Sequence, residues 1–334
     1  MSTNNAPGSS LVVGGNYIGA ILAGGKGTRM APFSDRYPKP LLPVANKPLM
    51  QYQIELMRDL GIRDILLIIG HKGYQIARVF GDGSALGVNI RYVEQTEVLG
   101  IAHATGRLEP YADRPMLLFL GDIFFVPKDL REMFVRFEAQ NGGAVLAAKK
   151  EDDFHAIQKN FAMILNENGM VKRVIEKPRH APNNLKGVGL YLFDLSVFDA
   201  IRRTPRTAMR DEYEITESIQ VMIDDGYDVS VTNCIVDDIN ITTPHDLLRC
   251  NLLEARQRSQ GFVMGSNVNL VPGASIENSV IGNNVVIPHP IKIRNTVIFD
   301  NTYVGVSNDI ENSILLPDCI VDCKHHAASI REMT

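Results

Sequence analysis

The residues best suited to chemistry form a glycine-rich stretch near the N-terminus, residues 22–29, which reads Leu-Ala-Gly-Gly-Lys-Gly-Thr-Arg. The stretch directly follows an unbroken apolar run, so its glycines stand where a buried strand is expected to end. Glycine lets a backbone come close to a ligand and turn its N–H groups toward anionic oxygens. The stretch therefore predicts a phosphate-binding loop. The residues expected to contact a nucleotide there are Leu22, Gly24, Gly25, Gly27 and Thr28.

The order of these residues excludes two common phosphate loops. A P-loop requires Ser or Thr directly after Gly-Lys, whereas Gly27 separates Lys26 from Thr28. The dinucleotide fingerprint requires a glycine where Met30 stands. The loop is thus expected to be of a third kind.

Two cations accompany the loop. Arg29 lies on it, and a planar guanidinium can hold two phosphate oxygens at once. Lys39 follows ten residues later between Pro38 and Pro40, which stiffen the backbone around it. Because two positive charges beside such a loop suit a triphosphate, Arg29 and Lys39 are the candidate catalytic residues.

The loop together with Lys39-Pro-Leu-Leu-Pro-Val44 resembles the signature of sugar-1-phosphate nucleotidyltransferases. The similarity is to glucose-1-phosphate thymidylyltransferases and to archaeal and bacterial relatives that add a C-terminal left-handed β-helix. It extends from about Tyr17 to Asn251 and then through the C-terminal tail. The resemblance implies a doubly wound α/β domain, dependence on Mg²⁺, and binding of a nucleoside triphosphate before a sugar 1-phosphate.

The resemblance continues in residues 95–104, which are similar to the segment of the family that reads the base. It implies that Gln95 hydrogen-bonds a pyrimidine edge and that Gly100 allows close approach. A glutamine amide both donates and accepts, which suits the imide of uracil or thymine. The segment therefore favours dTTP or UTP as the donor. A purine donor, as in the mannose-1-phosphate enzymes that use GTP, is the alternative.

Three further residues match the sugar-phosphate site of the family. The resemblance implies that Glu176 accepts hydrogen bonds from ring hydroxyls and that Lys177 neutralises the sugar phosphate. Gly187, in a Gly-Val-Gly-Leu-Tyr strand, belongs to the same site. Ala162 stands where many relatives have glycine, so the pocket is expected to differ in shape. The substrate is expected to be a hexose 1-phosphate such as glucose 1-phosphate, and its identity stays open.

The candidate metal ligands come from two places in the chain. Asp122 ends a predicted strand, and the carboxyl ends of strands line the crevice where open α/β sheets bind ligands. Hard divalent cations take oxygen ligands, so Asp122 is expected to hold Mg²⁺. Alignment on Pro244 puts Asn240 at the second metal position of the family. Asp238, on the same side of a strand by its period of two, is the alternative.

The implied reaction requires no enzyme nucleophile, because an oxygen of the sugar phosphate is already ionised at neutral pH. The chain accordingly lacks a Ser-His or Cys-His signature. Arg29 is expected on the β- and γ-phosphates, and Lys39 on the α-phosphate and the incoming oxygen. A non-catalytic regulatory subunit of the same fold is the alternative from another class.

The elements that must position these residues alternate between apolar runs and helical patterns. Unbroken apolar strands separated by helices are typical of a parallel sheet covered on both faces. The predicted fold is therefore α/β, a doubly wound, mostly parallel, Rossmann-like sheet. Strands are expected over 18–23, 64–69, 116–120, 143–148, 171–175, 188–193 and 229–236, and helices over 48–60, within 200–223 and over 244–258.

After Gly261, aliphatic residues recur at intervals of six, which predicts a short parallel β-helix. The predicted core positions are Met264, Leu270, Ile276, Ile281, Ile287, Ile293, Phe299, Ile310 and Leu316. Steps of five are expected from 276 to 281 and from 305 to 310. Three regions follow: a flexible extension over 1–16, a nucleotidyltransferase domain over 17–260, and the β-helix over 261–325.

The histidines and cysteines of the tail raise two further activities, acyl transfer and zinc binding. Neither is favoured, because the stretch is short and Cys-x₃-Cys without a second pair is weak evidence for zinc. The residues concerned are His289, His325, His326, Cys319 and Cys323. The tail is instead expected to mediate contacts in a homo-oligomer, a dimer or tetramer.

Composition limits the partners further. The 334 residues carry a net charge of −4 with both signs interleaved, so the basic stripe of a nucleic-acid binder is missing. No apolar run reaches the ~20 residues that span a bilayer, and the four cysteines are scattered. We expect a cytoplasmic protein that binds neither nucleic acid nor membrane.

Overall fold

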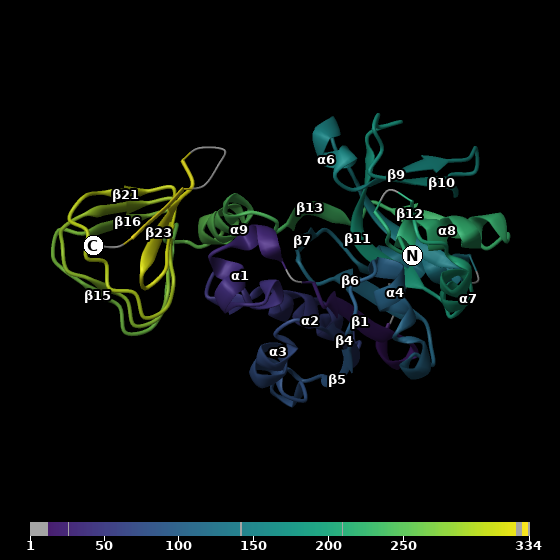
Figure 1. Cartoon of the computed structure of the whole chain (residues 1–334), viewed down its shortest axis with the longest axis horizontal. Helices are drawn as coiled ribbons and strands as arrows, with labels where there is room; N and C mark the ends of the chain where they lie inside the picture. Colours follow the sequence, from purple (N-terminus) through teal and green to yellow (C-terminus); the bar gives the residue numbers. More distant parts are fainter. Residues whose placement is uncertain (1–12, 26, 141, 209, 325–328, 333–334) are drawn as a thin grey trace, which may run out of the picture. The chain divides into compact units, whose positions relative to one another are not determined.

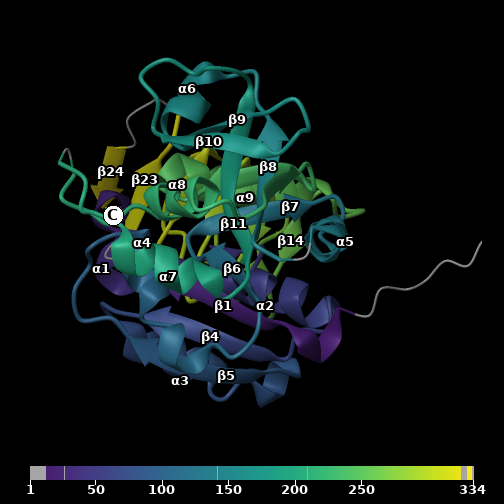
Figure 2. The same cartoon turned by 90° about the vertical axis from the view of Figure 1, so that its right-hand side faces the viewer.

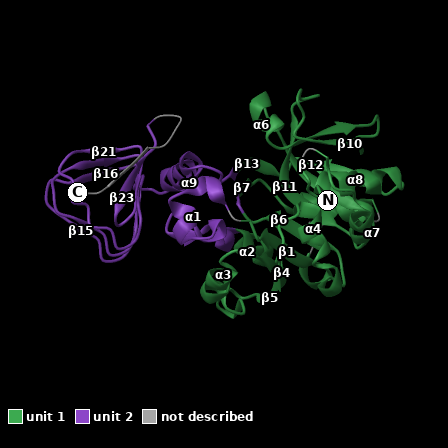
Figure 3. Ribbon diagram, viewed as in Figure 1, with its two compact units in different colours: residues 1–25, 53–121, 125–238 green, residues 26–52, 122–124, 239–334 purple. Residues whose placement is uncertain are grey.

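A computed structural model describes residues 13–25, 27–140, 142–208, 210–324 and 329–332. The chain forms two compact units, which Figure 3 distinguishes by colour. The first combines residues up to 25 with 53–121 and 125–238, and the second combines 26–52, 122–124 and 239–334. The segment that carries Arg29 and Lys39 therefore belongs to the same unit as the C-terminal tail. The predicted extension 1–16 lies largely outside the described residues.

A nine-stranded mixed sheet is the centre of the first unit. Its path runs β10-β9-β11-β6-β1-β4-β5, with β8 beside β11 and β12 beside β8, and Figure 2 shows β5, β4, β1 and β6 in succession. The strands are β1 (Ile18–Ala23), β4 (Asp64–Ile69), β5 (Asn89–Glu94), β6 (Met116–Leu120), β8 (Ala144–Lys150), β9 (Phe161–Leu165), β10 (Val171–Glu176), β11 (Leu185–Phe193) and β12 (Val229–Thr232). Strands β6, β1, β4 and β5 are parallel, whereas β11 is antiparallel to both β6 and β8.

Helices cover both faces of this sheet. Leu117 and Leu118 are adjacent in β6 and both are fully buried, so the two faces of the strand are both shielded from water. The helices, labelled in Figure 1 or Figure 2, are α2 (Leu49–Asp59), α3 (Gly73–Phe80), α4 (Ile101–Gly106), α5 (Arg131–Ala139), α6 (Phe154–Gln158), α7 (Ser196–Arg203) and α8 (Ile215–Asp224). The predicted doubly wound α/β class is confirmed. The sheet is mixed because β11 is antiparallel to β6 and β8, whereas β12 again pairs in parallel with β8.

Several further elements belong wholly or partly to the second unit. They are η2 (Thr28–Met30), α1 (Phe33–Arg36), η3 (Lys39–Leu41), β2 (Pro43–Val44), β3 (Lys47–Pro48) and α9 (Pro244–Arg256), while β7 (Ile123–Pro127) pairs with β13 (Ile235–Asn240). Helix α9 begins at the predicted proline, because Thr243 and Asp246 form a capping box. Inside α9, the buried Asn251 accepts from the Ala45 N–H at 2.9 Å and donates to the Pro43 carbonyl at 3.0 Å. The helix thereby holds the β2–β3 hairpin.

The tail is a β-helix with 17 residues in each coil. Strands pair in parallel at this interval, as in Val263 with Val280 and Val280 with Val297. The strands are β14 (Val263–Met264), β15 (Asn269–Leu270), β16 (Ser275–Glu277), β17 (Val280–Ile281), β18 (Val286–Ile287), β19 (Lys292–Arg294), β20 (Val297–Ile298), β21 (Ile310–Glu311) and β22 (Ser313–Leu315). Asparagines with positive φ occupy the corners, and the side chains of Asn267, Asn284 and Asn301 form a hydrogen-bonded ladder at 3.1 and 3.0 Å.

The predicted core positions from Ile276 to Ile293 are right, and so is Ile310. Met264 and Leu270 keep the predicted register but are 43% and 36% exposed, because they lie in the first coil, which pairs with another coil on one side only.

Phe299 and Leu316 are the positions at which the predicted register is wrong. The step of five falls between Ile293 and Ile298, because Ile298 pairs with Ile281 and joins the core of the coil. Leu315, not Leu316, then pairs with Ile298. In each case two bulky apolar residues are adjacent, so the pattern alone does not show which of them faces inward. The repeat ends at β22, since β23 (Cys319–Asp322) and β24 (Ser329–Glu332) add in antiparallel fashion.

Candidate active site

Three strands of the first unit end in glycines whose backbones nearly touch a neighbouring strand. Strand β1 leads into Gly24, β4 into Gly70 and β6 into Gly121. A Cβ atom on Gly70 would lie 2.6 Å from the Gly24 carbonyl oxygen, and one on Gly121 would lie 2.6 Å from the carbonyl oxygen of Leu22. Only glycine therefore allows this edge to close. Gly70 and Gly121 were not among the predicted site residues, although each directly follows an apolar run in the sequence.

Gln95 lies against the same edge. Its N–H donates to the Ile69 carbonyl at 2.8 Å, and the residue is 7% exposed. A Cβ atom on Gly24 would lie 2.5 Å from the Gln95 Oε1 atom. The structure thus brings together two of the predicted nucleotide-binding residues, and a larger residue at position 24 would displace the amide.

Gly100 has a contact of its own inside the protein. It adopts a φ of +109°, and a Cβ atom there would lie 2.4 Å from the Tyr213 carbonyl oxygen. The flanking backbone is fixed to the same residue, since Tyr213 N–H donates to Leu99 at 2.7 Å and Ala102 N–H donates to Tyr213 at 3.0 Å. Glycine is required at this position by the packing of the two segments.

In the second unit, Lys39 and Asp122 form an ion pair across 83 positions of the sequence. The Lys39 Nζ atom lies 3.3 Å from the Asp122 Oδ2 atom, and the two side chains are 10% and 37% exposed. Gly27 has a φ of +64°, and a Cβ atom there would lie 2.8 Å from the Lys39 Cγ atom. The predicted loop glycine therefore makes room for the lysine stem, which is held in place while the carboxylate stays accessible.

The loop cation Arg29 stands on the turn η2. Its neighbour Met30 is fully buried and anchors the turn, whereas Thr28 and Arg29 are exposed. A Cβ atom on Gly25 would meet nothing within 4 Å, so the described part of the loop is open there. Lys26 lies outside the described residues. An exposed guanidinium beside an open backbone is accessible to an anionic ligand.

Asp122 and Asn240 supply oxygen atoms from neighbouring segments of the second unit. The N–H of Ile241 donates to the Asp122 carbonyl at 2.9 Å, which ties the residue after Asn240 to Asp122. The exposed Asn240 Oδ1 atom accepts from the Thr242 hydroxyl at 3.2 Å. Two oxygen-bearing side chains thus extend from backbone segments that hydrogen-bond to each other.

This sparse donor set fits Mg²⁺. Within the described ranges, no group of three or more His, Cys, Asp or Glu residues could hold a metal ion. Mg²⁺ usually keeps several waters and binds through one or two protein oxygens together with phosphates. The zinc alternative has no support among the described residues, where burial raises the pKa of the Cys323 thiol to about 12. His325 and His326 lie outside the described residues.

Glu176, at the end of β10, is held by a cluster that sequence reasoning missed. Arg210 Nη1 lies 3.2 Å from Glu176 Oε1 and 2.8 Å from Glu214 Oε1, and the Thr216 hydroxyl donates to Glu176 Oε2 at 3.3 Å. Burial raises the pKa of the Glu176 carboxyl and the charge of Glu214 adds to this, although Lys177 and Arg210 oppose it. Lys177 Nζ lies 3.6 Å from Glu176 and is 42% exposed. The sequence signal that could have indicated Arg210 is its spacing of four residues from Glu214.

Gly187 lies one strand away from this cluster, on β11. A Cβ atom there would lie 2.0 Å from the Phe161 ring, so the aromatic ring fills the space that glycine leaves. Phe161 is in turn the register partner of Glu176 across β9 and β10. The predicted sugar-site residues Glu176 and Gly187 therefore flank the same phenylalanine.

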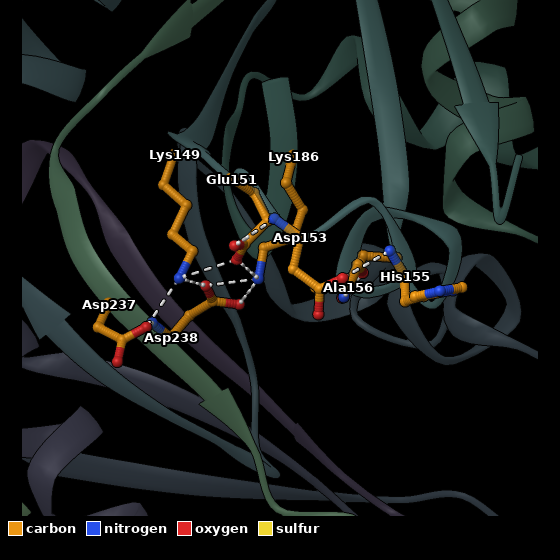
Figure 4. Close-up of polar contacts among 9 residues, drawn as sticks. Lys149, Glu151, Asp153, His155, Ala156, Lys186, Asp237 and Asp238 are labelled. Carbon is orange, nitrogen blue, oxygen red and sulfur yellow. Dashed lines mark hydrogen bonds and ion pairs between the residues drawn. The ribbon is translucent and has the colours of Figure 1, made fainter. Parts of the chain in front are cut away.

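A separate cluster of two lysines and three carboxylates lies in the first unit (Figure 4). Lys186 Nζ contacts both oxygens of Asp238, at 2.8 and 3.0 Å. Lys149 Nζ lies 2.7 Å from Asp237, 3.3 Å from Asp238 and 3.2 Å from Glu151. The structure thus places Asp238, the alternative metal ligand, between two ammonium groups.

The sequence model of the family described as "Nucleotidyl transferase" matches residues 18–237, well over half of the chain. The chain belongs to the nucleotidyl transferase family. A second description, the GlmU-like C-terminal hexapeptide domain, matches residues 251–327, so the β-helix of this nucleotidyl transferase is of the left-handed hexapeptide kind. The resemblance on which the sequence prediction rested is confirmed.

Relatives with known names support this membership. The nucleotidyl transferase is 35% identical to a low-salt glycan biosynthesis nucleotidyltransferase of Haloferax volcanii over 72% of this chain and 67% of that protein. It is 32% identical to a glucose-1-phosphate thymidylyltransferase of Streptomyces griseus over 78% of this chain and 74% of that protein. A UTP–glucose-1-phosphate uridylyltransferase of Haloferax volcanii is 32% identical over 62% of this chain and 83% of that protein.

Solved structures agree with the fold. A glucose-1-phosphate thymidylyltransferase from Bacillus anthracis, in complex with sucrose, superimposes with a TM-score of 0.64 at 29% identity, over 71% of this chain and 94% of that one. Among the described residues of the nucleotidyl transferase, no helix combines the length and apolar character that crossing a bilayer would require.

Proposed function

We propose that this nucleotidyl transferase joins a nucleoside monophosphate, from dTTP or UTP, to a hexose 1-phosphate such as glucose 1-phosphate. The products are a nucleoside diphosphate sugar and pyrophosphate. The observation that carries the proposal is the Lys39–Asp122 pair beside Gly27, because it combines a confined ammonium group with a carboxylate that is still accessible. The names of the relatives from Streptomyces griseus and Haloferax volcanii support the substrates.

In the proposed reaction an ionised oxygen of the sugar phosphate attacks the α-phosphorus, and the bond to the pyrophosphate oxygen breaks. The protein aligns the reacting groups and stabilises the charge that develops. Arg29 binds the β- and γ-phosphates with its forked guanidinium. Lys39 binds the α-phosphate and the incoming oxygen, and its stem, packed on Gly27, keeps the ammonium group in place.

Asp122 and Asn240 would hold Mg²⁺. We assign the second ligand to Asn240 because both oxygens of Asp238 already contact Lys186. The cation would neutralise part of the phosphate charge when bound. An asparagine brings an oxygen without a charge, so the site would rely on the substrate phosphates to complete it.

The residues that we propose for binding the base and for binding the sugar phosphate belong to the first unit. Gln95, set against Gly24, reads the pyrimidine, since its amide NH₂ can donate to an imide carbonyl and its Oε1 atom can accept from the imide N–H. Glu176 accepts from sugar hydroxyls, with Arg210 and Thr216 fixing its orientation. Lys177, partly exposed beside Glu176, binds the sugar phosphate.

The test is pyrophosphate release with Mg²⁺, measured for five nucleoside triphosphates against a panel of hexose 1-phosphates. We expect release that requires both substrates and is strongest with dTTP or UTP. Arg29→Ala should lower kcat/KM for the triphosphate by about 10²-fold, because a donor to the developing charge is lost. Arg131→Ala, which removes an exposed arginine paired with Asp129, is the matched control and should change it less than about twofold.

If the folded protein releases no pyrophosphate with any substrate pair of the panel, the result would instead favour the regulatory-subunit alternative. We also propose that the protein is cytoplasmic and forms a homo-oligomer through the β-helix. Light scattering of the full chain and of a chain ending before residue 261 would test the assembly. An unchanged oligomeric state after truncation would contradict it.

A further inference from the structure

The segment that carries Lys39 is packed onto the β-helix of the same unit. The ring centroid of Phe299 lies 5.6 Å from that of Phe33 and 6.1 Å from that of Tyr37. Phe33 is fully buried and Phe299 is 4% exposed. Adjacent residues of a strand point to opposite faces, so with Ile298 in the coil core Phe299 points outward. An outward aromatic residue on a β-helix is thus buried against α1.

Polar contacts join the same two parts. Arg36, at the end of α1, forms an ion pair with Asp318 of the tail. The Asn46 Nδ2 atom donates to the Ile281 carbonyl of β17 at 2.7 Å. These contacts lie on both sides of Lys39 in the sequence, three residues before it and seven after it. The loop around the lysine is therefore fixed at both ends to the β-helix.

The packing between them is incomplete. A pocket of about 190 Å³ lies beside Phe299 and is lined on the loop side by Tyr37, Leu41 and Asn46. Lys39 begins the turn η3, which ends at Leu41. The turn therefore has room to shift if the aromatic contact is lost, and Lys39 would shift with it.

We propose that the β-helix positions Lys39 for the reaction, with Phe299 as the main positioning residue and Asp318 as a weaker one. The inference rests on the proposed role of Lys39. It gives the tail a function within one chain, in addition to any role in assembly. Because a displacement of about 1 Å can cost about 10²-fold in rate, a loosened turn should affect turnover before it affects folding.

The test is a set of full-length variants measured with the best substrate pair of the panel. Phe299→Ala should lower kcat by about tenfold or more, and Phe299→Leu should restore most of it. Asp318→Ala should lower kcat about twofold, since the Arg36 pair is exposed. Glu311→Ala, which breaks the Arg294–Glu311 pair inside the β-helix, is the matched control and should leave kcat unchanged.

The decisive measurement is the double variant Lys39→Ala/Phe299→Ala. If Phe299 acts through Lys39, its removal should cost little further activity once Lys39 is gone. Equal fold losses in both backgrounds would overturn the inference, as would full kcat in a folded Phe299→Ala protein. An inactive wild-type enzyme would contradict the proposed function instead, so the two failures are distinguishable.

Discussion

Two lysine–carboxylate arrangements in this chain use the same chemical groups in opposite ways. Lys39 and Asp122 make one contact of 3.3 Å, and the aspartate side chain is 37% exposed. Lys186 contacts both oxygens of Asp238, and these side chains are only 4% and 2% exposed. The first pair leaves donors and acceptors for a ligand, whereas the second is satisfied within the protein. A candidate catalytic pair therefore differs from a structural one in its exposure to solvent and in its remaining capacity to form hydrogen bonds, not in residue type.

The buried cluster also shows what holds charges inside the first unit. Burial raises the pKa of the Asp238 carboxyl, although Lys186 and Lys149 oppose the shift. Burial opposes the charged form of Lys149, yet its hydrogen bond to Asp237 and the charge of Asp238 outweigh this and raise the pKa of Lys149. Each charge depends on its partners, so removing one leaves another uncompensated.

The largest effect on activity should come from the open pair. Lys39→Ala should lower turnover about 10²- to 10³-fold, because a donor to the charge developing at the α-phosphate is lost. Its free energy of unfolding should change by less than about 1 kcal/mol, since the pair is single and partly exposed. Steady-state kinetics and urea unfolding of the same preparation check both statements. Full turnover in the folded variant would remove Lys39 from the mechanism.

Sequence reasoning found the residues of the open pair because each lies in a local motif. Gly27 and Lys39 belong to the loop signature, and Asp122 follows an apolar strand and a glycine. The buried cluster had no such signal. Lys186 and Asp238 are 52 positions apart, and their meeting depends on strand register, which a slip of one residue would reverse.

The fold divides in the same way. The apolar strands β1, β4 and β6 and the proline-initiated helix α9 are encoded by residues close in sequence, and all were predicted. The inward position after Ile293 was not, because Ile298 and Phe299 are both apolar and adjacent. The parallel pairing of Ile298 with Ile281 places Ile298 in the coil core, and Phe299 packs against Phe33 instead.

The largest effect on stability should come from the closed cluster. Lys186→Met should lower the free energy of unfolding by about 3 kcal/mol, because Asp238 would keep a buried charge with only Lys149 beside it. The double variant Lys186→Met/Asp238→Leu should recover most of this loss, since both charges are gone. Chemical denaturation measures both. If the double variant is no more stable than the single one, the cost is not the unpaired charge.

The smallest effect concerns Glu176, a largely buried carboxylate that we propose binds the sugar. Its raised pKa means that, as pH falls, the folded protein takes up a proton before the unfolded chain does. The contribution of Glu176 to stability is therefore present at low pH and lost as pH rises through the raised pKa. Relative to Glu176→Gln, the wild type should gain unfolding free energy as pH falls through that window, and urea unfolding at a series of pH values measures the gain. In the same window its KM for the sugar phosphate should rise, because a protonated carboxyl accepts hydrogen bonds less well. A KM that changes with pH equally in Glu176→Gln would show that the titrating group lies elsewhere.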